Sequence, residues 1–352
     1  MEMLRAASSS LLNFVPVDCQ KTMLHPALID EFNAKADLLL VGGGGLVFHR
    51  PEDDSHSGWQ FNVREEDLDE IKVPLVVYGI GFNQFYYDDC GFEPRLNGHL
   101  RATQDKAALF SVRNRGTFHE LVSRGLDPAR MEVIPDPGMF VPPSPIELPG
   151  IREDEFKLGL NWAGDRAHHR FRDPWQTTRN AVIEALCQAI LRLFDTLGAG
   201  KLIFIPHLSD IDSEVAPLFE ERLGKVFYNV ETELPYIYPP SQAQVPFLAD
   251  IYRQMDLVIG MRGHANIIPL GMNTPFIGLG SHNKNHFFLD EVGEPENMIS
   301  LQDYPNGCSS DEMFDVIKRV IDDKTLGARL AECRAKMRAV SDAFNRKVVG
   351  LL

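Results

Sequence analysis

Residues 256–284 read DLVIGMRGHANIIPLGMNTPFIGLGSHNK. The apolar run at 256–260 is typical of a strand that is buried on both faces, and a second such run follows at 275–278. A short apolar helix is predicted to begin near Ala265, between the two runs. The stretch therefore predicts one strand–helix–strand unit of a parallel sheet.

The same alternation extends over most of the chain. It predicts further strands at 37–41, 75–79, 109–112, 132–134, 157–161, 202–206 and 226–228. It predicts helices at 96–108, 118–123, 178–197, 213–223, 246–255, 311–322 and 326–348. Continuous apolar strands separated by helices are typical of α/β proteins with helices on both faces of the sheet.

A proline-rich segment divides this pattern in two. Residues 140–151 (FVPPSPIELPGI) hold four prolines, which continue neither a helix nor a central strand. We expect two Rossmann-like α/β domains, 1–145 and 146–352, that face each other across a cleft. The helices at the end of the chain are expected to pack back on the first domain.

Composition limits the classes of function. The 352 residues are 44% hydrophobic and 24% charged, with a formal net charge of −15. This is an ordinary globular composition, and the acidic balance argues against broad nucleic-acid binding. No apolar run is long enough for a transmembrane helix, and Ser8 and Asn13 interrupt any signal-peptide core. Five dispersed cysteines are typical of reduced thiols, so we expect a cytoplasmic protein.

Ligands of open α/β sheets bind outside the carboxyl ends of the strands, so the residues after each strand are the candidates. In the first half, Gly43 and Gly44 either let the backbone approach an anion or only form a turn. Arg113 suits a phosphate or a carboxylate. Asp136, between two prolines, is a general base or holds a turn or an arginine. The aromatic run 85–87 stacks on a sugar or forms a partly buried loop.

The second half holds the strongest candidate. Arg262 and His264 follow a strand at the start of a helix, whose amides add positive potential. They predict a site for an anion that gains or loses a proton. Further candidate substrate-binding residues are Asn161, Arg166, His207 and Lys284. The basic segment 161–172 suits an anionic ligand or is a solvated loop, and its adjacent histidines, which point apart in an extended chain, make a poor metal pair, so no metal is expected.

The order of these motifs resembles that of the polysaccharide pyruvyl transferase family. The matching motifs are DLLLVGGGGLV (37–47), SVRNRGT (111–117), VIPDPG (133–138) and DLVIGMRGH (256–264). The resemblance implies a two-domain, glycosyltransferase-B-like (GT-B-like) fold. It implies transfer of a pyruvyl group from phosphoenolpyruvate (PEP) to a sugar, commonly as a cyclic ketal. His264 then matches the presumed general acid, Arg262 and Arg113 lie near PEP, and Lys284 is a further basic residue.

We therefore expect a PEP-dependent transferase of exopolysaccharide and cell-envelope biosynthesis that uses no cofactor and releases phosphate. Domain 146–352 would take the donor, and domain 1–145 would take the acceptor, either a lipid-linked oligosaccharide or a polysaccharide. The enzyme would be cytoplasmic, or peripheral at the inner face of the membrane. Two alternatives stay open, a GT-B glycosyltransferase that uses a nucleotide sugar and a non-catalytic protein that binds a glycan or an anion. The oligomeric state is left open.

Overall fold

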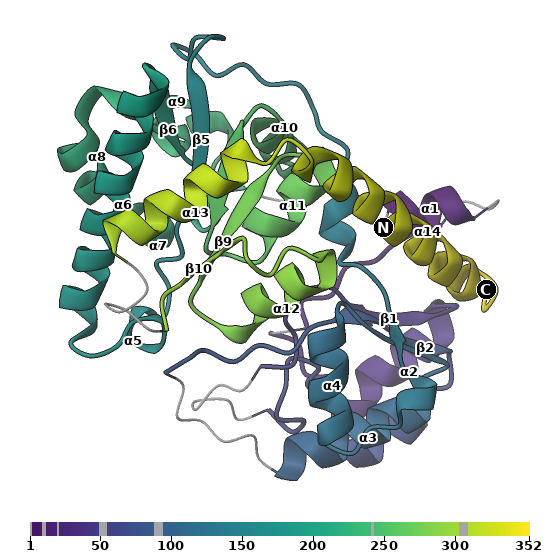
Figure 1. Ribbon diagram of the computed structural model, residues 1–352. Helices are drawn as coiled ribbons and strands as arrows, with labels where there is room; N and C mark the ends of the chain where they lie inside the picture. The colour runs from purple at the N-terminus through teal and green to yellow at the C-terminus, as the bar shows by residue number, and fades with distance from the viewer. Residues whose placement is uncertain are drawn as a thin grey trace. The chain divides into compact units, whose positions relative to one another are not determined.

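The computed structural model describes residues 2–8, 12–19, 21–48, 55–87, 94–240, 243–302 and 309–352 (Figure 1). The chain forms two compact units. The first consists of Met1–Gln84, Asp89–Pro137 and Ala335–Leu352, and the second consists of Phe85–Asp88 and Gly138–Arg334.

The first unit is built on a parallel sheet of four strands in the order β1-β2-β3-β4. The strands are β1 (Leu39–Gly42), β2 (Leu75–Ile80), β3 (Leu109–Val112) and β4 (Glu132–Val133). The helices are α1 (Glu2–Ala7), α2 (Pro26–Lys35), α3 (Pro94–Lys106) and α4 (Arg115–Ser123), with the 3-10 turns η1 (Glu65–Glu70) and η2 (Pro128–Arg130). β2 is buried along its whole length, as its run of apolar residues requires.

The last helix, α14 (Leu326–Val349), completes the core of the first unit. Its Phe344 and Val348 pack with Val76 and Tyr78 of β2. The Tyr78 hydroxyl donates a hydrogen bond of 2.6 Å to Oδ1 of Asn345, so the buried tyrosine keeps a polar partner.

The second unit is built on a parallel sheet of six strands in the order β10-β9-β8-β5-β6-β7. The strands are β5 (Phe156–Asn161), β6 (Gly200–Phe204), β7 (Phe227–Asn229), β8 (Leu257–Gly260), β9 (Phe276–Gly280) and β10 (Met298–Ser300). The helices are α5 (Ala167–Arg170), α6 (Trp175–Leu197), α7 (Ser209–Ser213), α8 (Ala216–Leu223), α9 (Val230–Glu233), α10 (Val245–Arg253), α11 (His264–Met272), α12 (Asn283–Val292) and α13 (Ser310–Asp322), with the 3-10 turns η3 (Pro137–Phe140), η4 (Gly224–Val226) and η5 (Pro235–Ile237). α13 packs against α6 (Figure 1).

The strand order of the second unit locates a binding region. β5 comes first in the chain but lies between β8 and β6, so the order of connections reverses beside it. Crevices at such a switch point, at the carboxyl ends of the strands, are where open α/β sheets bind ligands. The loops that follow β5, β6, β8 and β9 meet there.

The predicted α/β class and all nine predicted strands are confirmed, within one to two residues at most ends. The sequence missed the three-residue β10 and the helices α1, α2, α5, α7, α9 and α12. The helix predicted at 213–223 is confirmed as α8, which ends at Leu223 as predicted but begins three residues later, at Ala216, while the preceding α7 ends at Ser213. Pro217 has no amide hydrogen and is tolerated only in the first turn of a helix, so a new helix starts there.

The structure also bears on membrane-spanning helices and on the cysteines. Among the described residues, no helix is both long and apolar enough to cross a membrane. Cys19 and Cys187 are free thiols, whereas Cys90 and Cys308 lie outside the described residues.

Candidate functional site

Two arginines and two aspartates lie together at the switch point of the second unit. Arg262, directly after β8, donates from Nε to Asp212 Oδ2 at 2.7 Å and from Nη2 to Asp165 Oδ1, also at 2.7 Å. Arg170 of α5 donates from Nη2 to the same Asp165 oxygen at 3.0 Å. We call Asp165, Arg170, Asp212 and Arg262 the arginine–aspartate cluster.

Asp212 anchors this cluster. Its side chain is completely buried, and its two oxygens accept hydrogen bonds from the backbone amides of Gly164, His207 and Leu208 as well as from Arg262. It therefore joins the loops after β5, β6 and β8. Gly164 has to be glycine, because a Cβ there would lie 1.9 Å from the carbonyl oxygen of Ile211.

Asp165 is the shared partner of both arginines. Burial raises the pKa of this carboxyl, but the charges of Arg170 and Arg262 outweigh burial and hold the pKa at about 2. Burial lowers the pKa of Arg170 to about 10, which still leaves the guanidinium charged at neutral pH. Arg170 also donates to the Ser281 hydroxyl at 2.8 Å, which ties α5 to the loop after β9.

Asn161, the last residue of β5, binds the backbone of Arg262. Its side chain is completely buried, with Oδ1 accepting from the amide of Arg262 and Nδ2 donating to the carbonyl of Ile205. An amide held in this way is closed to a substrate. Where the sequence predicted substrate contact, the structure therefore assigns Asn161 to positioning Arg262.

His207, after β6, is held by Tyr252 of α10. Its Nε2 lies 2.7 Å from the buried Tyr252 hydroxyl. Burial, together with the charge of Arg262, lowers the pKa of His207 to about 3, so the imidazole is neutral at pH 7. Asp212 contacts the backbone of His207, not its ring, and so does not orient the imidazole.

His264 begins α11, two residues after Arg262, and the side chain of Lys284, the second residue of α12, reaches the same place. His264 is the first residue of α11 and is exposed to solvent. The stem of Lys284 passes Gly263, with its Cε 3.7 Å from where a Cβ would be, and its charge contributes to the lowered pKa of Asp165. Amides at the start of a helix attract negative charge. An anion placed here would therefore meet Arg262, Lys284 and the first backbone amides of α11.

The basic segment after β5 turns sharply at Arg166, whose φ of 55° lies in the left-handed region. Bulky residues adopt this conformation only when their surroundings hold them in it. The neighbouring His168 and His169 do not point apart as predicted, because α5 is helical there and brings their ring centroids to 4.0 Å. Among the described residues, no group of three potential ligands could hold a metal ion.

In the first unit, Arg113 and Asp136 form a buried pair. Arg113 Nη1 lies 3.3 Å from Asp136 Oδ2, and both side chains are less than 10% exposed. Of the two roles that the sequence left open for Asp136, this contact favours holding an arginine. The guanidinium lies against Gly81, where a Cβ would be 2.1 Å from Arg113 Nε. Gly43 and Gly44 have φ of 90° and 75°, a conformation that favours glycine.

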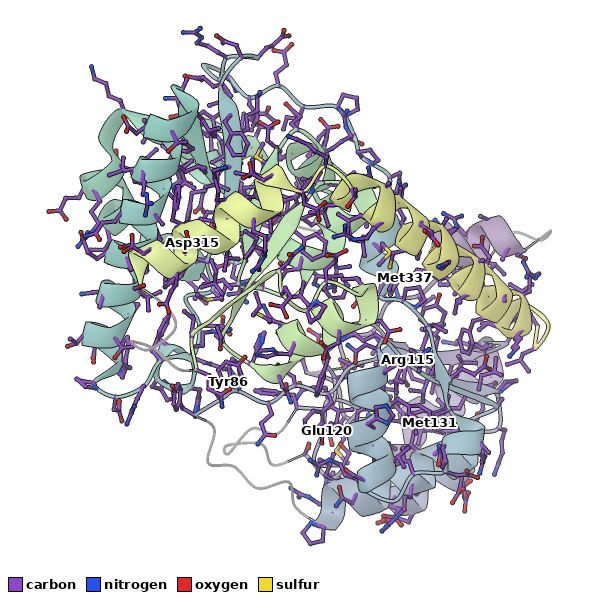
Figure 2. The ribbon with its side chains drawn as sticks, in the orientation of Figure 1. Tyr86, Arg115, Glu120, Met131, Asp315 and Met337 are labelled. Carbon is purple, nitrogen blue, oxygen red and sulfur yellow. The ribbon has the colours of Figure 1, made fainter. Side chains whose placement is uncertain are left out.

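The predicted site residues thus fall into two sets. Asn161, Arg166, His207, Arg262, His264 and Lys284 belong to the second unit, and Gly43, Gly44, Arg113 and Asp136 to the first. Sequence reasoning missed Asp165 and Tyr252 as members of the site. An acidic residue inside the basic segment was the available signal for Asp165, whereas Tyr252 lies within an apolar helix and gave none. Arg115, which Figure 2 labels at the start of α4, is exposed.

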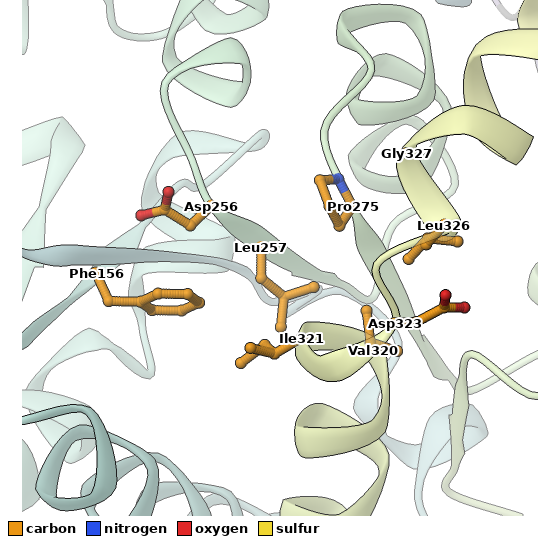
Figure 3. A pocket seen from close by; sticks show the side chains of 9 residues that line it. All are labelled: Phe156, Asp256, Leu257, Pro275, Val320, Ile321, Asp323, Leu326 and Gly327. Atoms are coloured by element: carbon orange, nitrogen blue, oxygen red, sulfur yellow. The ribbon is translucent and has the colours of Figure 1, made fainter.

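A cavity of about 150 Å³ lies at the opposite edge of the second sheet, where β5 and β8 begin (Figure 3). Its charged lining residues are Asp256 and Asp323, and the rest of its side chains are mostly apolar, including Phe156, Leu257 and Leu326. Carboxylates repel an anion, so this cavity does not suit the ligand that the arginine–aspartate cluster suits.

The family profile described as "Polysaccharide pyruvyl transferase" matches residues 5–283. No curated protein matches the chain by sequence.

Several solved structures are similar in fold. MnaA of S. aureus with UDP has 14% identity and a TM-score of 0.55, covering 88% of this chain and 74% of that one. UDP-GlcNAc 2-epimerase of Neisseria meningitidis, bound to UDP-GlcNAc, has 11% identity and a TM-score of 0.52, covering 92% and 79%. HepE of Anabaena with UDP and glucose has 12% identity and a TM-score of 0.50, covering 92% and 80%. These likenesses confirm the predicted GT-B-like fold.

Proposed function

Because the chain belongs to the polysaccharide pyruvyl transferase family, we propose that it transfers the pyruvyl group of PEP to sugar hydroxyls, forms a cyclic ketal and releases phosphate. The observation that carries this proposal is the excess of positive charge at the switch point of the second unit, next to an exposed histidine. The proposal assigns the donor to the second unit and the sugar acceptor to the first.

The charges around the arginine–aspartate cluster suit a ligand with several negative charges. Arg166, Arg170, Arg262 and Lys284 supply four cations against the carboxylates of Asp165 and Asp212, which leaves an excess of two positive charges. PEP carries a phosphate and a carboxylate. Arg262 is 17% exposed and offers an edge of its guanidinium to such a ligand, whereas the buried Arg170 acts through Asp165.

The exposed position of His264 suits a proton donor. In the proposed reaction, the imidazolium gives its proton to the methylene carbon of PEP, which becomes a methyl group and leaves C2 electrophilic. A sugar hydroxyl adds to C2 and gives its proton to the imidazole that the first step left neutral, and phosphate departs with the electrons of its C–O bond. A second hydroxyl then adds to C2, gives its proton to the departed phosphate and closes the ketal.

The family of the chain supports the acceptor assignment. The family acts on polysaccharides, so the proposed acceptor is a polysaccharide or a lipid-linked oligosaccharide. The proposal places the protein in the cytoplasm or peripherally at the inner face of the membrane, without a cofactor.

Thermal unfolding with PEP, inorganic phosphate and UDP-GlcNAc at matched ionic strength tests the donor. A ligand at 100 times its Kd adds about 2.7 kcal/mol to the free energy of unfolding. We expect a shift with PEP that exceeds the shift with phosphate. A shift with UDP-GlcNAc alone would favour the nucleotide-sugar alternative. Binding of PEP without phosphate release, across a panel of methyl glycosides and polysaccharides, would favour the non-catalytic alternative.

Replacing His264 with alanine tests the proposed proton donor. A general acid contributes about 10²–10⁴-fold, so His264→Ala is expected to slow phosphate release from PEP by that factor while the Kd for PEP stays within a few-fold. His119→Ala, which changes an exposed histidine of α4, is the matched control. An unchanged rate in His264→Ala would remove His264 from the mechanism. The same assay with Arg113→Lys tests the role in PEP binding that the family implies for Arg113.

A further inference from the structure

Three aromatic residues from the first half of the chain pack within the second unit. Residues 85–87, which we call the aromatic strap, follow β2 in the chain but belong to the second unit. Phe85 forms an antiparallel bridge with His282, and the amide of Tyr87 donates to the carbonyl of His169 at 3.3 Å. The Tyr87 hydroxyl donates to the carbonyl of Gln302 at 2.8 Å. The ring of Tyr86, labelled in Figure 2, lies 5.8 Å from that of His286.

The ring of Phe85 is closed to a sugar. It is 4% exposed, so it cannot provide the stacking surface that was one of the two interpretations of this run. The guanidinium carbon of Arg170 lies 4.7 Å from the ring centroid, and that of Arg166 lies 5.9 Å from it. The rings of His169 and His282 lie 6.0 Å and 5.4 Å away.

A ring in this position holds Arg170. The guanidinium edge of Arg170 binds Asp165 and Ser281, and the ring lies within cation–π distance of the same group. Arg170 is 2% exposed, so protein groups such as this ring, and not bulk water, surround its guanidinium. Asp165 in turn binds Arg262, whose exposed edge is the proposed contact for PEP.

We infer that Phe85 is a positioning residue of the anion site. It fixes Arg170, Arg170 fixes Asp165, and Asp165 fixes Arg262, so Phe85 controls the affinity for PEP without touching it. This inference rests on the proposed function, because it assumes that the cluster binds PEP.

Isothermal titration of PEP into the full chain and its variants tests the inference. A buried cation–π contact is strong enough that its loss in Phe85→Leu is expected to raise the Kd for PEP roughly tenfold. Phe85→Tyr keeps an aromatic face and is expected to bind within about twofold of the wild type. Phe171→Leu is the matched control, because Phe171 is also buried and is adjacent to Arg170 in sequence but stacks on Trp162. It is expected to lower the melting temperature with little effect on the Kd.

A milder variant covers the case in which Phe85→Leu does not fold. Tyr87→Phe removes the hydroxyl that donates to Gln302, at the outer end of the strap, and is expected to raise the Kd for PEP about two- to threefold. The inference is wrong and the proposed function stands if the wild type binds PEP and Phe85→Leu binds it equally well, or if Phe171→Leu weakens binding as much as Phe85→Leu. Where Phe85→Leu does not fold, wild-type affinity in Tyr87→Phe overturns the inference in the same way. If the wild type does not bind PEP, the proposed function fails and the inference fails with it.

Discussion

Replacing Asp212 with asparagine is the sharpest test of how the second unit is held together. The substitution keeps the size of the side chain and removes its charge. In the wild type, each of the two carboxylate oxygens of Asp212 accepts hydrogen bonds from N–H groups of Arg262 and of the backbone. Whichever oxygen becomes an NH₂ group, it faces other donors, so the variant loses hydrogen bonds and gains none.

The magnitude follows from burial. Asp212 is completely buried and Arg262 is 17% exposed, so the pair is close to fully desolvated. Breaking such a pair by removing one partner costs about 3–5 kcal/mol. Asp165 still binds Arg262, which places the expected loss near the lower end, at about 3 kcal/mol. For a unit of this size, that corresponds to a melting temperature lower by about 10 °C.

Urea unfolding followed by tryptophan fluorescence measures the loss, because Trp162 and Trp175 lie in the second unit. Asp210→Asn is the matched control, since Asp210 is an exposed aspartate of the same helix, and it is expected to unfold like the wild type. If Asp212→Asn unfolds within about 1 kcal/mol of the wild type, the anchoring role argued for Asp212 is refuted.

Three further predictions concern other parts of the chain. Gly81→Ala puts a Cβ 2.1 Å from Arg113 Nε, so the guanidinium must move, and urea unfolding should show a loss of about 1–3 kcal/mol. Tyr78→Phe removes the 2.6 Å hydrogen bond to buried Asn345 and should cost about 1–3 kcal/mol in the same assay. The pKa of Asp165, about 2 when folded, lies below its unfolded value, so its stabilisation of about 2 kcal/mol is complete above pH 4 and is lost as the pH falls towards 2. Unfolding measured from pH 5 to 2 should show this loss in the wild type, and a loss that persists unchanged in Asp165→Asn would contradict the assignment.

The strands were predictable because each is a short apolar run with its own boundaries. β8 (Leu257–Gly260) and β9 (Phe276–Gly280) are examples, since both are buried along their whole length and hold no polar side chain. β10 (Met298–Ser300) was not predictable, because three residues at the end of the strand order, next to β9, carry too little pattern. The signal in the sequence for the break between α7 and α8 was Pro217. Proline is tolerated in the first turn of a helix and breaks it further along, so this signal can be used only when the start of the helix is known.

The candidate site was predictable in part. Arg262 and His264 stand out because they follow a strand, and the position of such residues at the carboxyl edge is a general property of parallel sheets. Asn161 also lies at the carboxyl end of a strand, yet its side chain is engaged in hydrogen bonds with the backbone of Arg262 and Ile205. The rule gives the edge of the sheet, and tertiary contacts decide which side chains at that edge stay open to a ligand.

The sequence by itself determined the α/β class, the order of strands along the chain and the motifs that identify the family, because each depends on residues close together in the chain. Tertiary structure alone decided that Asp165 and Asp212 pair with Arg262, which they precede by 97 and 50 residues. It also decided that Phe85 faces the arginines of the second unit. Partners so far apart meet only once the sheet has formed, and no local pattern records which acid will neutralise which base.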